Sequence, residues 1–329
     1  MAIQHYIKEI GRGTRGAKAL ERAQAADLMG QILDGHASDY EVGAFCIAMR
    51  IKGETADEMC GLWDAVQARM HCFAASSAPL IVIPSYNGAR RLPTLTPLLA
   101  MLLARRGHPV LVHGMATESS RTTAFAVLER LGVTPRQQVA GAIAEGDVAC
   151  VHTATLLPAL ARLLAVRQLI GLRNPGHSVA KLLQPAAGRC VLLGSYTHPE
   201  YLPMLHATLG TLGANALLSR GLEGEVCADP RRTPQYDGFV GGHYQLLQAK
   251  GSGTDSTVPG LPTAIDADTT AQYTAAVLAG YLPVPPGLAQ QVDFITALAN
   301  QTMAAADHLA PNTARPTSLS SYQNRSNQP

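Results

Sequence analysis

The sequence predicts an α/β protein in which a small all-helical domain precedes a larger α/β domain with a mainly parallel sheet. Three observations lead to this fold class. The first 75 residues carry helix-start and helix-stop signals, and short apolar runs alternate with helical segments from residue 79 onward. The third is length, since a chain of 329 residues is longer than one hydrophobic core normally supports.

The helical domain is predicted from three segments with clear boundaries. The first places apolar side chains at near-helical spacing and stops at Gly35. Ser38 is followed three residues later by Glu41, and Thr55 by Glu58, which is the spacing of a capping box. Helices are therefore expected over residues 17–35, 38–53 and 55–70.

The α/β domain is predicted from the alternation that follows. The apolar runs have strand length and are rich in Val, Ile and Leu, as in the buried strands of a parallel sheet. Strands are expected in the segments PLIVI (79–83), HPVLVHG (108–114), GDVACVH (146–152), RCVLLGSY (189–196) and ANALLSRG (214–221). Helices are expected over residues 97–106, 120–132, 156–171, 177–184, 199–213, 270–280 and 286–309.

The composition and the N-terminal sequence indicate where in the cell the protein is located. No apolar stretch reaches membrane-spanning length, and the N-terminus lacks the pattern of a signal peptide, so a cytoplasmic protein is expected. The six cysteines are scattered without a C-x-x-C pair, which predicts reduced buried thiols and no structural zinc. The last segment, residues 311–329, has no apolar periodicity and is predicted to be disordered.

Basic residues concentrate in three zones although the formal net charge is only +2. Residues 148–199 contain no Asp or Glu, residues 84–136 hold seven arginines, and the N-terminal segment GRGTRGAK adds three more cations. If the fold gathers part of these zones on one face, a positive groove suited to phosphates results. The alternative is that the arginines are spread over a solvated surface.

The segment IPSYNGARR follows the first expected strand, where an α/β protein places a ligand-binding turn. Such turns usually carry glycines that let backbone amides approach a phosphate. This one has a single glycine and offers side chains instead, namely Ser85, Tyr86, Asn87, Arg90 and Arg91.

The segment SDYEVGAFCIAMRIKGETADEM, followed by a strand, VHG and VLERLGV, resembles the glycosyltransferase family 3 fold of anthranilate phosphoribosyltransferases and pyrimidine nucleoside phosphorylases. The resemblance covers about residues 5–310. It implies a cleft between two domains in which substrate binds. The implied division is a helical domain of residues 1–75 with inserted helices at about 156–184, an α/β domain of residues 78–155 and 185–310, and the tail.

Departures from the enzymes' motifs bear on function. The phosphoribosyl pyrophosphate loop G-T-G-G-D falls on Pro84 to Gly88, which has lost three glycines and the acid. The motif K-H-G-N falls on Val112 to Met115, and of the magnesium-binding acids only Glu225 is matched. One carboxylate is a poor magnesium site. No metal, no cofactor and no catalytic residue are therefore expected, and His113 is interpreted as structural.

The strings IKEIGRG, IPSYNGAR and ADPRRTP are similar to the YbiB-like branch of this family, which implies sequence-nonspecific nucleic-acid binding through the basic cleft. The partners expected are single-stranded DNA and RNA, with duplex DNA left open. Resemblance places the cations of the cleft at Arg90, Arg91, Arg121, Arg173 and Lys181.

Each expected contact has a chemical role. The arginines supply permanently charged bidentate contacts to phosphate, Ser85 and Asn87 add neutral hydrogen bonds, and Tyr86 stacks on an unpaired base. Each residue also has an alternative as a packed or solvated surface side chain. A mobile basic arm is expected at the N-terminus from Arg12, Arg15 and Lys18, with a frayed terminus as the alternative. Arg231 and Arg232 are the weakest candidates.

Two further expectations follow from the resemblance. The helical domain is expected to form a homodimer, as is usual in the family. The second functional hypothesis is a phosphoribosyltransferase or other glycosyltransferase that acts on a nucleotide-like or aromatic substrate with phosphoribosyl pyrophosphate and magnesium.

Overall fold

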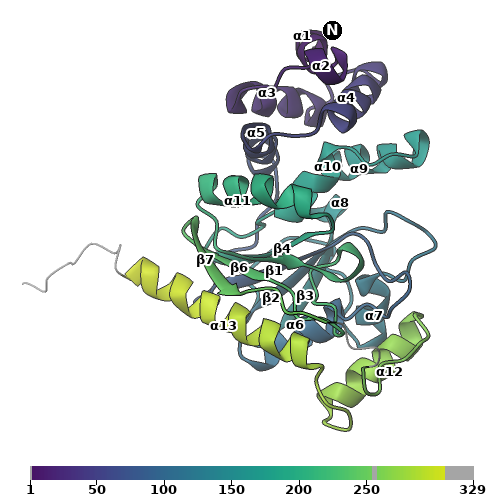
Figure 1. Ribbon diagram of the computed structural model, residues 1–329, viewed down its shortest axis with the longest axis vertical. Helices are drawn as coiled ribbons and strands as arrows, with labels where there is room; N and C mark the ends of the chain where they lie inside the picture. Colours follow the sequence, from purple (N-terminus) through teal and green to yellow (C-terminus); the bar gives the residue numbers. More distant parts are fainter. Residues whose placement is uncertain (1, 254–257, 308–329) are drawn as a thin grey trace, which may run out of the picture.

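The computed structural model describes residues 2–253 and 258–307 of the chain. A layer of helices from the N-terminal part lies above a twisted sheet, and further helices cover the opposite face of that sheet (Figure 1). The tail 311–329, predicted to be disordered, lies outside the described residues, as does the end of the helix expected to run to residue 309.

The N-terminal helices begin where the capping signals predicted. The side chain of Ser38 accepts a hydrogen bond from the backbone N–H of Glu41, and that of Thr55 accepts one from the backbone N–H of Glu58. The carboxylate of each glutamate accepts in turn from the backbone N–H of its cap residue. Two short helices at the N-terminus were not predicted. The helices are α1 (Gln4–Ile10), α2 (Gly13–Gly16), α3 (Arg22–Leu33), α4 (Asp39–Lys52) and α5 (Ala56–Gln67).

The sheet has seven strands in the order β3-β2-β1-β4-β5-β6-β7. The first five in this order pair in parallel, and β6 and β7 add antiparallel pairs at one edge. The prediction of an α/β fold with a mainly parallel sheet is confirmed. The strands are β1 (Leu80–Ser85), β2 (Val110–Gly114), β3 (Val148–His152), β4 (Cys190–Tyr196), β5 (Ala216–Arg220), β6 (Tyr236–Val240) and β7 (His243–Gln248).

The hairpin of β6 and β7 was missed by the sequence analysis. Its turn is Gly241-Gly242, and both glycines have positive φ, of 55° and 81°. Two glycines between short apolar segments are a known hairpin signal. The signal is weak here because Gly238 interrupts β6 and polar residues occupy much of β7.

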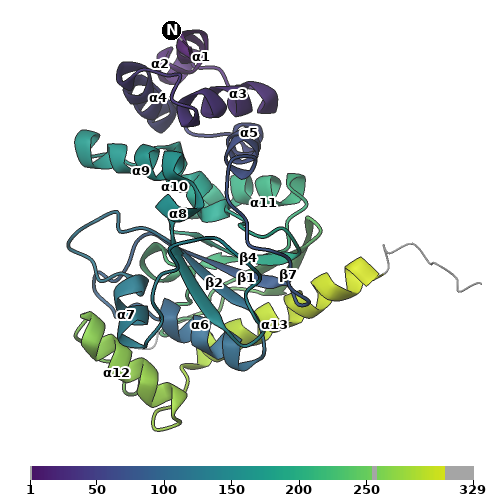
Figure 2. The same cartoon turned by 180° about the vertical axis from the view of Figure 1, so that it is seen from behind.

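Helices cover both faces of the sheet. In Figure 2, α6, α7, α12 and α13 lie on the side away from the N-terminal helices, and α8 and α11 lie on the near side. The remaining helices are α6 (Thr96–Arg105), α7 (Ala124–Arg130), α8 (Thr153–Leu156), α9 (Pro158–Ile170), α10 (Pro175–Val179), α11 (Leu202–Thr211), α12 (Ala267–Leu278) and α13 (Pro286–Asp307). Short 3-10 turns follow α10, β4 and β5 at Ala180–Leu182, Pro199–Tyr201 and Leu222–Gly224.

Alternation along the strands divides the core into two clusters. In β1, Val82 packs with the core that includes the N-terminal helices, whereas Ile81 and Ile83 pack with the core under α6 and α13. Successive side chains of a strand point to opposite faces, so a strand buried on both sides reads as a continuous apolar run.

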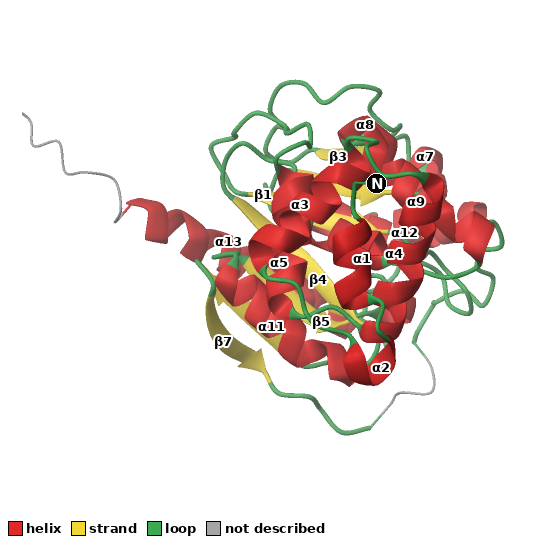
Figure 3. Ribbon diagram, turned by 90° about the horizontal axis from the view of Figure 1, so that it is seen from above, coloured by secondary structure: helices red, strands yellow, loops and turns green. Residues whose placement is uncertain are grey.

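The segment after β3 crosses to the N-terminal helices. Helices α9 and α10 lie beside α4 and α5 rather than under the sheet (Figures 1 and 3). The indole N–H of Trp63 donates to the carbonyl of Leu182 at 2.8 Å, and the amide of Gln67 donates to that of Gln184 at 3.0 Å. These bonds fix the orientation of the inserted segment. The domain boundaries stated above remain a prediction.

The six cysteines, all within the described residues, are free thiols, and five are buried. None of the helices in the described part of the chain has the length and apolar character needed to cross a lipid bilayer.

Candidate functional site

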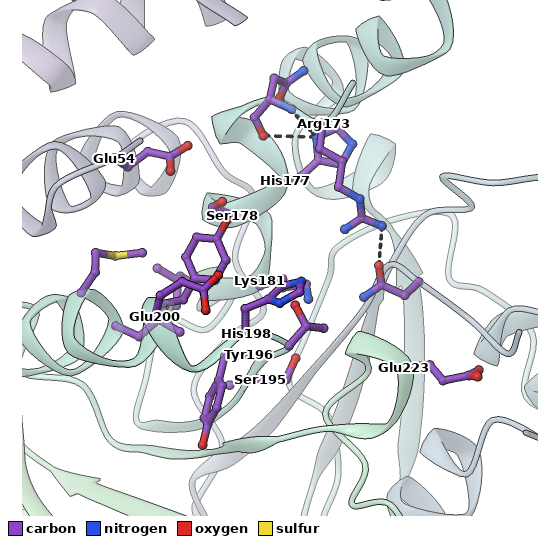
Figure 4. A pocket seen from close by; sticks show the side chains of 18 of the residues that line it. Glu54, Arg173, His177, Ser178, Lys181, Ser195, Tyr196, His198, Glu200 and Glu223 are labelled. Atoms are coloured by element: carbon purple, nitrogen blue, oxygen red, sulfur yellow. Dashed lines mark hydrogen bonds between the residues drawn. The ribbon is translucent and has the colours of Figure 1, made fainter. Parts of the chain in front are cut away.

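A cleft of about 880 Å³ lies at the carboxyl ends of β1 and β4, below α4 and α10 (Figure 4). The strand order changes direction between these two strands, because β1 leads to β2 on one side and β4 leads to β5 on the other. Chains leaving the two strands diverge at such a switch point and leave a crevice, which is where open α/β sheets bind ligands. The order of the strands therefore explains why the cleft lies at the ends of β1 and β4.

The loop that follows β1, residues 86–91 (the β1 loop), forms one end of the cleft. Gly88 has a φ of 72°, and a Cβ there would lie 2.6 Å from the carbonyl oxygen of Thr122. Only glycine fits this turn without rearrangement. The side-chain amide of Asn87 donates to the carbonyl of Gly224 at 2.6 Å, which ties the β1 loop to the segment after β5.

Two carboxylates from the segment after β5 satisfy the amides of the β1 loop. Buried Glu225 accepts from the backbone N–H of Asn87 at 2.7 Å and of Gly88 at 2.9 Å, both through Oε1. Its Oε2 accepts from the hydroxyl of Thr96 at 3.3 Å. Glu225 was matched to a magnesium-binding acid, but here its carboxylate is turned inward to the chain's own donors.

Glu223 makes the second pair of bonds. Its Oε2 accepts from the backbone N–H of Arg90 at 2.6 Å and its Oε1 from that of Arg91 at 2.9 Å. Glu223 has a φ of 53°, a left-handed conformation that is costly for a residue with a side chain. The guanidinium groups of Arg90 and Arg91 are exposed and line the cleft.

Arg173 and Lys181 extend the cationic lining from the inserted segment. Arg173 donates to the side-chain carbonyl of Asn87 (Figure 4). The ammonium of Lys181 donates to the carbonyl of Gly224 at 2.9 Å. Burial lowers the pKa of both, to about 8 for Lys181. Desolvation, assisted by the charge of Arg173, also lowers the pKa of His177 to about 4, so this ring is neutral near pH 7.

Arg121 also lines the cleft, but its charge is already matched. Glu118 accepts from Arg121 Nε at 2.8 Å and from Arg167 Nη2 at 2.6 Å. The two arginines lower the pKa of Glu118. The trio keeps one net positive charge, so Arg121 is a weaker phosphate contact than its position alone indicates.

Five cations of the cleft form no ion pair in the part of the chain that the structure describes. They are Arg50, Arg90, Arg91, Arg173 and Lys181. Arg50 of α4 was not predicted, because nothing in a helical sequence shows which charged face a neighbouring domain will adjoin. The cleft also contains the acids Glu54 and Glu200, and burial raises the pKa of Glu54.

An aromatic and apolar wall faces these cations. Tyr196, which is only 8% exposed, ends β4, and His198 follows it (Figure 4). Tyr201, which is 39% exposed, is the N-cap residue of α11. Met204 and Leu205 of α11 continue the surface. The wall was not predicted, although the string THPEY directly after the buried strand β4 carried the signal.

The expected roles of Tyr86 and Ser85 are wrong for this structure. Tyr86 is buried, and its hydroxyl lies 3.0 Å from both His113 Nδ1 and Thr153 Oγ1. A ring packed inside the sheet end cannot stack on a base. Ser85 is likewise buried at the end of β1 and does not line the cleft. His113 is fully buried, and desolvation lowers its pKa to about 3.

The expected basic arm is also corrected. Arg12, Arg15 and Lys18 lie in and after the short helices α1 and α2, at the end of the helical layer far from the sheet (Figure 1). Arg12 pairs with Glu9 at 2.7 Å and Lys18 with the same residue at 3.6 Å. None of the three lines the cleft, because these turns fold back onto α4.

The remaining points concern two arginines outside the cleft and metal binding. Arg231 and Arg232, the weakest candidates, both pair with Asp229 and do not line the cleft. Within residues 2–253 and 258–307, no group of three or more His, Cys, Asp or Glu side chains is placed to hold a metal ion.

Residues 4–70 match the helical bundle domain of the glycosyl transferase family. Over 316 residues the chain is 37% identical to YbiB of Escherichia coli (strain K12), which covers 94% of this chain and 98% of that protein. It is 34% identical over 219 residues to anthranilate phosphoribosyltransferase 2 of Ralstonia nicotianae (strain ATCC BAA-1114 / GMI1000), covering 65% of this chain and 63% of that protein.

Solved structures agree on the fold. The crystal structure of anthranilate phosphoribosyltransferase (TrpD) from Thermus thermophilus superposes with a TM-score of 0.69 at 21% identity and covers 92% of this chain and 89% of that one. The likeness extends over both the helical layer and the sheet. The chain belongs to the YbiB-like branch of the glycosyl transferase family and has the TrpD-like fold of anthranilate phosphoribosyltransferase.

Proposed function

We propose that the protein binds nucleic acid through the cleft, without sequence preference and without a catalytic step. One observation carries this proposal: the same cleft is lined by five cations and by an aromatic wall. Among the described residues, none of these cations has a carboxylate partner. Cations hold the sugar-phosphate backbone, and aromatic rings stack on bases of any identity. The strings that resemble the YbiB-like branch gave the same expectation from the sequence.

The aromatic wall favours single strands. Stacking on Tyr201 or His198 needs a base whose face is free, and bases in a duplex are already stacked. Single-stranded DNA or RNA is therefore the expected ligand, and duplex DNA is expected to bind more weakly. A cytoplasmic location, where such strands are found, is part of the proposal.

Local charge rather than net charge drives this binding. The chain carries a formal charge of only +2, so steering over long distances is weak. Contacts inside the cleft still release counterions from the strand. If about five phosphates are neutralised, the log of the association constant falls with the log of the salt concentration at a slope near −3.5.

A transferase is the second candidate, favoured by the 34% identity to an anthranilate phosphoribosyltransferase. The residues present do not fit its magnesium and phosphoribosyl pyrophosphate. Glu225 binds two backbone amides and a hydroxyl instead of facing the cleft, and both carboxylate oxygens of the neighbouring acid Glu223 accept from the backbone amides of Arg90 and Arg91. Incubation with anthranilate, phosphoribosyl pyrophosphate and magnesium is expected to give no product above a protein-free control, and turnover would favour the enzyme.

A homodimer is proposed through the helical layer. An exposed apolar stripe runs along α4, with Tyr40 at 92%, Ile47 at 37% and Ile51 at 57% exposure. Leu169 at the end of α9 is 86% exposed. A second copy of this chain is the expected occupant, because a twofold contact lets a stripe on one helix cover itself. Two clefts per dimer would raise avidity for long strands.

Fluorescence anisotropy of a labelled 20-nucleotide oligo-dT across a salt series tests the binding proposal. Arg90→Ala/Arg91→Ala is expected to reduce the steepness of the salt slope by about 1.4, because two phosphate contacts are lost. Arg105→Ala/Arg106→Ala is the matched control, since this adjacent pair lies at the end of α6 outside the cleft. Equal losses in both variants, or no binding by the parent at low salt, would contradict the proposal.

A further inference from the structure

Two backbone N–H groups of the β1 loop donate to a carboxylate of the same chain, that of Glu223. The N–H groups of Arg90 and Arg91 are adjacent, and the two oxygens of Glu223 accept one each, at 2.6 and 2.9 Å. Consecutive amides that converge on one anion form an anion-binding nest. Two oxygens of a phosphate offer acceptors in the same arrangement as two carboxylate oxygens.

Glu223 and Glu225 differ in how firmly they are held. Glu225 is buried and makes three hydrogen bonds, so it is a permanent part of the loop. Glu223 is half-buried and lies at the edge of the cleft (Figure 4). Its backbone is left-handed, and its two hydrogen bonds are exposed. A half-buried carboxylate can be rehydrated when it leaves its donors, whereas a buried one cannot.

The cations around the nest are in excess of what Glu223 neutralises. The exposed guanidinium groups of Arg90 and Arg91 belong to the residues that donate the amides, and both line the cleft without a carboxylate partner for the side chain among the described residues. A phosphate seated on the two amides would also reach these side chains. A carboxylate fixed at position 223 satisfies only the backbone.

We propose that the paired amides of Arg90 and Arg91 are a phosphate site of the cleft, and that Glu223 occupies this site as a built-in competitor that a strand phosphate displaces. This inference rests on the proposed function, because the displacing phosphate is taken to be that of a nucleic acid strand. It assigns a regulatory role to Glu223: the residue weakens occupation of the cleft by any ligand that lacks enough phosphates to displace it.

Removal of the competitor is expected to strengthen binding. Glu223→Gln keeps the shape and removes the charge, and oligo-dT should bind about tenfold more tightly with a salt slope steeper by about 0.7, the value for one added phosphate contact. Glu129→Gln is the control, because it removes an exposed carboxylate of α7 that lies outside the cleft and binds no amide of the β1 loop. In the control, affinity should change less than about threefold and the slope should stay the same.

A second variant distinguishes loss of the charge from distortion of the loop by the glutamine. Glu223→Gly suits a φ of 53° and removes the side chain entirely, so it should match or exceed the affinity gain of Glu223→Gln. Equal gains in Glu223→Gln and Glu129→Gln would show a general charge effect and overturn the proposal. Weaker binding in both position-223 variants would do the same, since Glu223 would then be a loop support.

Inorganic pyrophosphate separates this proposal from the proposed function. If the parent chain does not bind oligo-dT at low salt, nucleic-acid binding fails, and calorimetric titration with pyrophosphate alone decides the role of Glu223. Binding by Glu223→Gly that is about tenfold tighter than binding by the parent, or more, would support the phosphate site without a nucleic acid. Equal or absent pyrophosphate binding in the two proteins would then overturn it.

Discussion

Tyr201 is the side chain on which base stacking depends in this account. It stands at the start of α11 in the aromatic wall and is 39% exposed, whereas Tyr86 is sealed inside the sheet end. Tyr201→Ala is expected to weaken oligo-dT binding by about 1–3 kcal/mol without changing the salt slope, because stacking releases no counterions. Tyr281→Ala is the control, since Tyr281 is 84% exposed and does not line the cleft. An unchanged affinity in Tyr201→Ala would exclude the wall as a stacking surface.

Lys181 gives the cleft a dependence on pH. Its pKa is lowered to about 8 by burial, so the ammonium is present at pH 7 and is lost as the pH rises through about 8. Affinity measured from about pH 6.5 to 9 is expected to fall about tenfold for the parent, the loss of one charged contact. Lys181→Arg keeps its charge over this range and is expected to bind independently of pH. A parent with flat pH dependence would show that Lys181 contacts no phosphate.

Among the elements, α5 depends on a buried ion pair at its first turn. Glu58 is fully buried and accepts from Lys52 Nζ at 2.6 Å and from the amides of Leu20 at 2.8 Å and Thr55 at 2.9 Å. Glu58→Ala leaves a buried cation and two donors unpaired and is expected to cost about 3–5 kcal/mol of stability, read from urea unfolding. Ser38→Ala, at the exposed cap of α4, should cost only about 1 kcal/mol. Equal costs would mean that Glu58 acts as a cap alone.

Element prediction from sequence worked where local chemistry decides the outcome. Capping boxes at Ser38 and Thr55 placed the starts of α4 and α5, and the continuous apolar runs of β1 to β5 predicted the parallel sheet. Local signals are weaker in the hairpin of β6 and β7, where polar residues and a strand glycine obscure the alternation. Helices as short as α1 and α2 carry too few residues for a periodic signal.

The candidate site was harder to predict than the elements. Asn87, Arg90 and Arg91 were correctly predicted to line the cleft, because they follow the first parallel strand and the loop there borders the switch point. Burial of Tyr86 depends on partners 27 and 67 residues away, His113 and Thr153. Likewise the capture of the loop amides by Glu223 depends on contacts between residues 132 and 133 positions apart. Long-range pairing of this kind has no local signature.

At the scale of the whole molecule, the exposed stripe on α4 predicts a dimer. Ile47→Glu places a charge in the middle of that stripe and is expected to halve the mass measured by analytical ultracentrifugation, while the fold and the cleft stay intact. Leu246→Glu alters a residue of similar exposure on β7, at the far edge of the sheet, and should leave the mass unchanged. A parent chain that sediments as a monomer would contradict the dimer.

Photocrosslinking tests most directly whether the cleft holds a strand. An oligo-dT in which single thymidines are replaced by 4-thiothymidine is irradiated with the protein, and the crosslinked peptides are mapped by mass spectrometry. Crosslinks are expected in the exposed part of the aromatic wall, at His198 and Tyr201, where unpaired bases would stack. Crosslinks confined to α1, α2 or the β7 edge, with none in the cleft, would contradict this expectation.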